Sequence, residues 1–399
     1  MVNITDLKQE QKISPILRLA FRPFFLFGSL FGFLAIAIWA LSLNSVISFT
    51  PFNGLLWWHS HEMLFGFVAA IVAGFLLTAV QTWTSIPSIK GAKLFCLFIV
   101  WLAARLVLAF APDINVFIIM AIDIAFIPLA ATFLAWPIIK IKQYRNLIFI
   151  PILALMTLAN IMSYLPSLGY QASFNQQATY GTVLIITFLV AFLGGRVIPM
   201  FTANGTKTEK VQPKKWLEIS ALFSLFLVFA FFIADNTQHS ELLTYLCFLS
   251  AVLHTIRQLR WRPWVTLQVP LVWSLHFTMM FIPIGLFMLC LHFKFNAVSI
   301  SVAMHSLTVG VIGGMIMAMM SRVSLGHTGR PLKIHWLMQF AFASIILSAF
   351  VRGVAVAIWP ALSVNLWSFS AALWCFSFIC FLAIYAPILS APRADGRPG

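Results

Sequence analysis

Twelve long apolar segments follow one another along this chain of 399 residues, and they limit its fold more than any other feature. A helix that crosses a membrane needs about 20 apolar residues. Only helices and closed barrels can cross a bilayer, because every backbone polar group there needs an internal partner. The segments are residues 21–43, 58–83, 92–111, 114–137, 145–165, 179–201, 216–234, 241–260, 268–292, 297–320, 335–358 and 361–387. The sequence therefore predicts an all-α polytopic membrane protein, a bundle of twelve transmembrane helices.

The composition supports this class and excludes several others. Hydrophobic residues make up 61% of the chain and charged residues 9%, whereas soluble domains have roughly 45–50% and about 25%. So few charges cannot cover a solvated surface, which excludes a cytosolic enzyme, a secreted disulfide scaffold and a disordered chain. The net charge of +15 raises the question of nucleic-acid binding. The cations lie in short loops rather than on one basic face, so we expect a lipid bilayer and no nucleic acid as partner.

The loops predict the topology. Nearly all lysines and arginines outside the apolar segments lie in one set of alternate loops, and the other set holds Lys294 alone. Because cytoplasmic loops are enriched in Lys and Arg, both termini are predicted to be cytoplasmic. We expect a cytoplasmic N-terminal segment at residues 1–20, a single twelve-helix membrane domain at 21–387 and a cytoplasmic tail at 388–399.

Charged residues within the apolar segments are candidates for a functional site, because they are costly at membrane depth. Arg105 in the third span and Asp123 in the fourth flank a short turn at similar depth, which favours an ion pair. That pair is either a structural clamp or part of a site. Arg352 lies in the eleventh span without an acid nearby in sequence, and Glu62 in the second span is a candidate partner.

Histidines cluster at the predicted outer ends of spans two and ten. Span two contains His59, His61 and Glu62, and span ten contains His305. Imidazole suits iron, copper and zinc, and facing helices of a bundle commonly hold haem iron through histidine. Residues two apart on a helix point about 200° apart, so His59 and His61 are expected to serve different sites or partners. The alternative is a group of ordinary interfacial polar residues.

We predict that His61 and His305, from spans two and ten, meet near the periplasmic side as ligands of one metal, with His59 at a second metal or as an orienting residue. Glu62 would hydrogen-bond a ligating histidine, and Arg105 and Arg352 would hold cofactor carboxylates. His254 and His276, in the inner halves of spans eight and nine, are further candidate ligands or simple hydrogen-bond partners of a neighbouring helix.

A second polar group is predicted at the inner ends of the spans. Its members are Arg22, Arg196, Arg322 and His327. They serve either as cytoplasmic anchors and helix caps or as a site for an anion or a cofactor carboxylate. No catalytic residue can be named from these patterns.

Several motifs in this order resemble the NnrS family from residue 15 to about 387. They are Arg22-Pro23-Phe24-Phe25, the run from Trp58 to Phe67, the run from Gly74 to Val80, the run from Gly194 to Pro199, and the run from Arg322 to Arg330. The resemblance implies a multi-pass protein of the bacterial inner membrane with haem and copper, linked to nitric oxide metabolism and resistance to nitrosative stress. A looser similarity to the catalytic subunit of haem-copper oxidases is limited, because spans six and seven carry no histidine.

The leading hypothesis is therefore a haem- and copper-containing membrane protein, and the enzyme class open to such a protein is a membrane haem oxidoreductase. Its partners would be nitric oxide or a related small ligand and a respiratory electron donor. Redox or ligand chemistry would occur at a His-ligated metal. Two rivals stay open: a secondary transporter, which the twelve spans and buried charges would suit, and an assembly factor that handles haem or metal.

Overall fold

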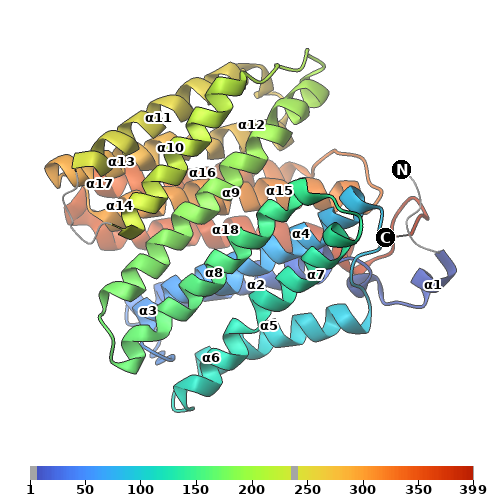
Figure 1. Ribbon diagram of the computed structural model, residues 1–399, viewed down its shortest axis with the longest axis horizontal. Helices are drawn as coiled ribbons and strands as arrows, with labels where there is room; N and C mark the ends of the chain where they lie inside the picture. The colour runs from blue at the N-terminus through green and yellow to red at the C-terminus, as the bar shows by residue number, and fades with distance from the viewer. Residues whose placement is uncertain (1–6, 235–240, 399) are drawn as a thin grey trace. The chain divides into compact units, whose positions relative to one another are not determined.

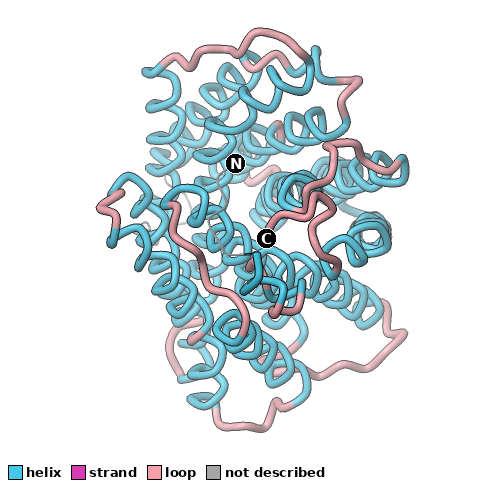
Figure 2. Tube along the Cα trace, turned by 90° about the vertical axis from the view of Figure 1, so that its right-hand side faces the viewer, coloured by secondary structure: helices cyan, strands magenta, loops and turns pink. Residues whose placement is uncertain are grey.

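The computed structural model describes residues 7–234 and 241–398, and helices form most of that part, which contains no strand. Figure 2 shows these helices joined by loops. Twelve of them are long and apolar enough to cross a membrane: Phe21–Leu43, Leu55–Thr84, Ala92–Phe110, Val116–Lys140, Tyr144–Leu168, Ser173–Thr206, Lys215–Ala234, Glu241–Arg260, Pro270–Phe295, Ile300–His327, Trp336–Ile358 and Pro360–Ser390. The predicted number of spans is confirmed, whereas the orientation of the termini stays a prediction.

Most helices extend a few residues beyond the apolar segments. The largest difference is at the sixth span, which runs over Ser173–Thr206 instead of the predicted 179–201. The added residues are mostly polar or small, and a helix continues through them because its backbone hydrogen bonds do not depend on apolar side chains. Hydropathy thus located the spans, while their ends depended on local helix formation.

The contacts divide the chain into two compact units, with boundaries inside three long helices. Unit 1 contains residues 1–179, 320–333 and 378–399, and unit 2 contains residues 180–319 and 334–377. The prediction of one membrane domain stays a prediction.

Unit 1 is built on the first five spans. Its main elements are α2 (Phe21–Leu43), α3 (Leu55–His61), η2 (Glu62–Val68), α4 (Ala69–Thr84), α5 (Ala92–Phe110), α6 (Val116–Ile124), α7 (Phe126–Lys140), α8 (Phe149–Tyr164) and the start of α9 (Ser173–Thr206). Helix α2 packs on α4. A Cβ atom added at Gly74 would come within 2.8 Å of the Cβ of Phe24, so the small residue permits close contact between α4 and α2.

Unit 2 is built on the later spans. Its elements are the rest of α9, α10 (Lys215–Ala234), α11 (Glu241–Arg260), α12 (Pro270–Met279), α13 (Phe281–Phe295), α14 (Ile300–His305), η6 (Ser306–Gly313), part of α15 (Gly314–His327), α16 (Trp336–Phe350), η7 (Val351–Ala355), α17 (Val356–Ile358) and part of α18 (Ser363–Ser390). Helix α11 packs against α10 and α13, and Figure 1 shows α10 and α11 side by side. Added Cβ atoms at Gly310 and Gly314 would collide with Phe281 and Thr278, so glycine at both positions lets these helices approach closely.

Three segments of the described helices are π-helical: η2, η6 and η7. A π-helical turn is wider than an α-turn, costs hydrogen-bond geometry and is frequent at functional sites. Segment η2 begins directly after His61, η6 begins directly after His305, and η7 contains Arg352. The irregular turns therefore coincide with three of the residues singled out by the sequence.

Candidate functional site

The centre of unit 1 is a buried cluster of charged side chains from three spans. His61 ends α3, Glu62 begins η2, Arg105 lies on α5 and Asp123 on α6. All four are at most 3% exposed. Since charges are stable at such depth only when they are paired, their mutual contacts determine what the cluster can do.

Arg105 links the two carboxylates. Its Nη1 lies 2.8 Å from Oε1 of Glu62, and its Nη2 donates to Oδ1 of Asp123. A Cβ at Gly66 would collide with Nη1 of Arg105 and with the ring of Phe31, so glycine is needed for the guanidinium to reach Glu62. The expected Arg105–Asp123 pair is present. Glu62 is paired with Arg105, rather than with Arg352 as the sequence suggested.

The ring of His61 completes the charge balance. Its Nδ1 lies 3.1 Å from Oε1 of Glu62, as expected for a carboxylate that orients the ring. Its Nε2 lies 2.9 Å from Oδ1 of Asn160 and 3.2 Å from Oδ2 of Asp123. Both ring nitrogens thus face acceptor oxygens, which suits a doubly protonated imidazolium. With Arg105, this imidazolium would neutralise the two carboxylates.

Helix α8 supplies two polar partners that sequence analysis did not single out. Nδ2 of Asn160 donates to Oδ2 of Asp123 at 2.8 Å, and the hydroxyl of Tyr164 donates to the same oxygen at 3.0 Å. Asn160 and Tyr164 are four residues apart and so share one helix face. Two hydrogen-bonding side chains at this spacing within an apolar span were the signal that could have identified them.

An aromatic layer covers the cluster. The indole of Trp57 stacks on the His61 ring with centroids 4.3 Å apart, and its Nε1 donates to the Ser163 carbonyl at 3.0 Å. Nε1 of Trp101 donates to the Gly66 carbonyl in η2 at 2.9 Å. This shell lowers the local dielectric constant, which strengthens the attraction between the enclosed charges.

His59 lies on a different side of the same helix from His61. Its ring stacks on Trp39 with centroids 4.7 Å apart, while His61 stacks on Trp57. The two imidazoles therefore have separate surroundings, as the helical spacing predicted.

In unit 2, His305 and Arg352 form a second polar centre. Nδ1 of His305 lies 2.7 Å from the Ser301 carbonyl and donates to it, because a carbonyl only accepts. Nε2 then carries the lone pair and lies 3.2 Å from Nη2 of Arg352. Arg352 is 8% exposed, and its Nη1 has no hydrogen-bond partner within the described part of the chain. A Cβ at Gly353 would collide with Ser306, so glycine lets η7 approach η6.

His61 and His305 belong to different units, and each has its own partners there. Their predicted meeting at one metal stays a prediction. Of the described residues, His61, Glu62 and Asp123 bring one ligand atom each to within 4.8 Å of one another. This is the one such group found in that part of the chain.

The other two candidate ligands contact neighbouring helices of unit 2. Nε2 of His254 donates to the Ala221 carbonyl at 3.0 Å, and Nε2 of His276 lies 2.8 Å from Oγ1 of Thr202. These contacts are the simple hydrogen bonds that the sequence left as the alternative to metal ligation.

The predicted inner group is divided between the units. In unit 1, Nη1 of Arg22 donates to the carbonyls of Leu389 at 2.8 Å and Ala391 at 2.7 Å, and the ring of His327 packs near Phe21. Arg22 thus anchors the end of α18. Arg322 is partly buried on α15 in the same unit. Arg196 belongs to unit 2, where its guanidinium lies 4.1 Å from the Phe192 ring centroid.

Together these features define a multi-pass helical membrane protein with buried polar centres beside widened helical turns. Residues 15–393 match the family model described as NnrS protein. The chain therefore belongs to the NnrS family, which confirms the resemblance drawn from the motifs. No curated protein matches the chain. Family membership fits a membrane protein related to nitric oxide.

Proposed function

We propose that this chain is a haem- and copper-containing protein of the bacterial inner membrane that acts in nitric oxide metabolism and resistance to nitrosative stress. The observation that carries the proposal is the state of His305, whose Nδ1–H is held by the Ser301 carbonyl. This leaves the Nε2 lone pair, which accepts from Nη2 of Arg352 at 3.2 Å, as the donor atom for a metal, and iron would take the place of that contact. Histidines that bind metals are commonly oriented in this way.

The residues of unit 2 fit haem on a second count. Nη1 of Arg352 is buried and has no partner among the described residues, beside the donor nitrogen of His305. A cofactor carboxylate would satisfy this guanidinium through a charge-assisted hydrogen bond. His305 would hold the iron, and Arg352 would orient the cofactor. Haem iron, when bound, supplies a coordination position for a small ligand such as nitric oxide and a redox couple for an electron donor.

The residues of unit 1 fit a second metal. His61, Glu62 and Asp123 offer one nitrogen and two carboxylate donors, and Oε2 of Glu62 is buried without a partner in the described structure. Nitrogen and oxygen donors suit Cu(II), which has the highest affinity among the divalent first-row metals. Copper binding would require His61 to release the proton on Nε2.

A spectrum and a metal analysis of the purified full-length protein test both assignments. We expect a Soret band, and we expect His305→Ala to remove or shift it while the matched control His292→Ala leaves it unchanged. We expect copper in the wild-type protein and a large loss of copper in Asp123→Asn. An unchanged Soret band in His305→Ala rejects that residue as the iron ligand.

A secondary transporter is the second candidate, because the buried cluster His61–Glu62–Arg105–Asp123 has the kind of paired charges used in proton coupling. The same preparation separates the two proposals. A folded protein that is colourless and free of metal would reject the haem and copper assignments and favour transport. A metal-containing protein that delivers haem or copper to a respiratory enzyme would favour an assembly factor.

A further inference from the structure

Unit 2 contains a basic cavity that the proposed metal chemistry does not use. Its volume is about 410 Å³, which lies in the size range of small-molecule sites. It is lined by residues from α9, the 207–214 loop, α10 and α11. Five lining side chains are cationic, against one carboxylate, that of Glu218: Arg196, Lys210, Lys214, Arg257 and Arg260.

The most informative of these cations is Arg257, whose side chain is 1% exposed. Its Nε and Nη2 donate to Oε2 of Glu218 at 2.9 and 2.7 Å, and Nη2 also donates to the Ala191 carbonyl at 3.0 Å. Its Nη1 is buried and has no hydrogen-bond partner in the described residues. A buried donor without a partner costs about 1–3 kcal/mol, so this guanidinium has binding capacity that Glu218 leaves unused.

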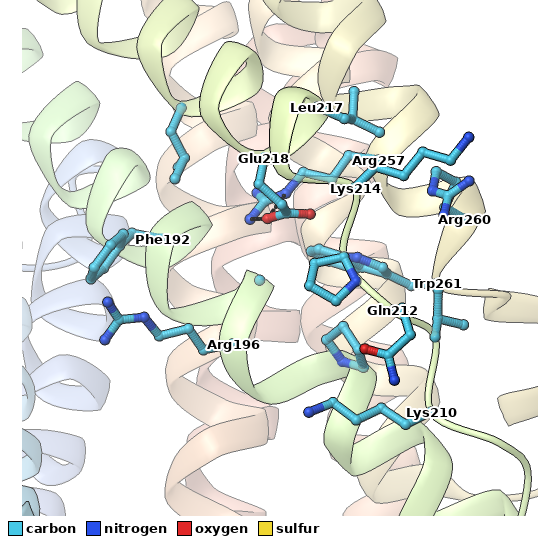
Figure 3. Close-up of a pocket in the computed structure, with 15 residues that line it drawn as sticks. Phe192, Arg196, Lys210, Gln212, Lys214, Leu217, Glu218, Arg257, Arg260 and Trp261 are labelled. Carbon is cyan, nitrogen blue, oxygen red and sulfur yellow. Dashed lines mark hydrogen bonds and ion pairs between the residues drawn. The ribbon is translucent and has the colours of Figure 1, made fainter.

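The motif Gly194-Gly195-Arg196 explains how the pair reaches this position. A Cβ at Gly195 would collide with Nη2 of Arg257 and lie 2.9 Å from Oε2 of Glu218. Glycine therefore lets the ion pair rest against α9. Figure 3 shows the Arg257–Glu218 pair in the middle of the lining, with Arg196 on one side and Arg260 on the other.

The chemistry of the lining selects the ligand. One carboxylate cannot neutralise five cations, so the cavity favours an anion with several acceptor oxygens. Guanidinium forks and lysines together suit phosphate groups. The cavity is also larger than a single phosphate needs, and its lining includes the apolar side chains of Phe192, Leu217 and Leu222. Basic pockets between membrane helices at the cytoplasmic side bind lipid head groups, and the loop pattern predicts that this end of the helices is cytoplasmic.

We propose that the cavity between α9, α10 and α11 binds the phosphate group of an anionic phospholipid head group, with Arg257 as its buried contact. Lys210, Lys214 and Arg260 supply the surrounding positive charge. Glu218 is a competing anion, which keeps Arg257 paired when the head group is absent.

Titration of the delipidated full-length protein, monitored by native mass spectrometry, tests this proposal. The probes are dioctanoyl phosphatidylglycerol, dioctanoyl phosphatidylcholine and inorganic phosphate. We expect phosphatidylglycerol to bind more tightly than phosphatidylcholine. If inorganic phosphate binds as tightly as phosphatidylglycerol, the cavity is a site for soluble phosphate. Phosphate recognition is then supported, and the lipid is rejected as its source. If neither phosphatidylglycerol nor phosphate binds, the proposal is overturned.

The triple variant Lys210→Gln/Lys214→Gln/Arg260→Gln should weaken phosphatidylglycerol binding by about 100-fold, since each basic residue near an anionic lipid contributes about 1 kcal/mol. The matched control Lys90→Gln/Lys93→Gln/Arg145→Gln removes the same charge from residues that do not line the cavity, and should weaken binding by less than about threefold. Equal losses in the two variants, or no loss in the first, overturn the proposal.

Glu218→Gln distinguishes a carboxylate that competes with the lipid from one that only stabilises the fold, because only the competitor weakens lipid binding. Removing the competing carboxylate frees Arg257, so phosphatidylglycerol should bind roughly tenfold more tightly, the value of one charge-assisted hydrogen bond. The lipid should also raise the melting temperature of this variant more than that of the wild type. A folded Glu218→Gln protein with unchanged or weaker lipid binding contradicts the proposal.

Discussion

The buried arginines of the two units have opposite surroundings. In unit 1, Arg105 lies between Glu62 and Asp123, and the imidazolium of His61 would complete a neutral set. In unit 2, Arg352 forms no ion pair within the described residues, and its contacts are the His305 ring nitrogen and the face of Trp367 at 5.1 Å. A buried charge without a counter-charge is costly. The charges of the first centre therefore balance within the protein, whereas the second has a cation without a counter-charge among the described residues.

The largest expected effect comes from breaking the complete centre. Arg105→Met leaves two carboxylates buried without their cation, and removing one partner of a buried ion pair costs about 3–5 kcal/mol. The free energy of unfolding, measured by SDS titration in mixed micelles, should fall by this amount. Arg145→Met, at an exposed position, should change it by less than about 0.5 kcal/mol. A loss below about 1 kcal/mol for Arg105→Met would contradict the charge balance described for unit 1.

A smaller effect is expected from crowding the same centre while all its charges remain. In Gly66→Ala the new methyl group meets Nη1 of Arg105 and the ring of Phe31, and overpacking of this kind costs about 1–3 kcal/mol. Gly326→Ala is the matched control, because no atom lies within 4 Å of its added Cβ. That control should be neutral or gain up to about 1 kcal/mol from helix propensity. Equal stability of the two variants would show that Arg105 can reach Glu62 by another path.

Arg352→Gln tests the other side of the comparison. In metal-free protein its removal leaves no carboxylate unpaired and relieves the desolvation of a buried cation, so the unfolding free energy should change by less than about 1 kcal/mol. In protein loaded with haem, the same variant should bind the cofactor more weakly. The measurements are SDS titration and haem retention during gel filtration. A destabilisation as large as that of Arg105→Met would mean that Arg352 already has an anionic partner.

The smallest effect is expected at the partly exposed ion pair of the C-terminal tail. Nη2 of Arg393 lies 2.6 Å from Oδ2 of Asp395, and hydrogen bonds from Arg393 lower the pKa of Asp395 from 3.8 to about 2. Because this pKa is depressed in the folded state, the contribution to stability is present above about pH 4 and is lost as the pH falls to about 2. Asp395→Asn should remove at most about 1 kcal/mol at pH 7. Hydrogen exchange of the tail at pH 7, compared between the wild type and Asp395→Asn, measures this loss of local stability. A loss above about 1 kcal/mol would contradict the small contribution expected of a partly exposed ion pair.

The centres themselves were only partly predictable. The sequence identified Arg105, Asp123, His61 and Glu62 as costly residues inside spans, and it predicted the Arg105–Asp123 pair from their similar depth on either side of one turn. It did not identify Asn160 and Tyr164, because amides and phenols are tolerated in spans and attract less attention than charges. It also suggested Arg352 as the partner of Glu62, since depth along a span does not determine which helices are neighbours.

The number and position of the twelve spans followed from the sequence alone, because the bilayer requires each crossing to be a long apolar helix whatever its neighbours are. Family membership also followed from short motifs in order. The pairing of buried charges, the π-helical turns after His61 and His305, and the unused donor of Arg257 were decided only by the tertiary structure. They depend on which helix faces pack together, and on glycines that let side chains approach backbones, neither of which hydropathy along one segment can specify.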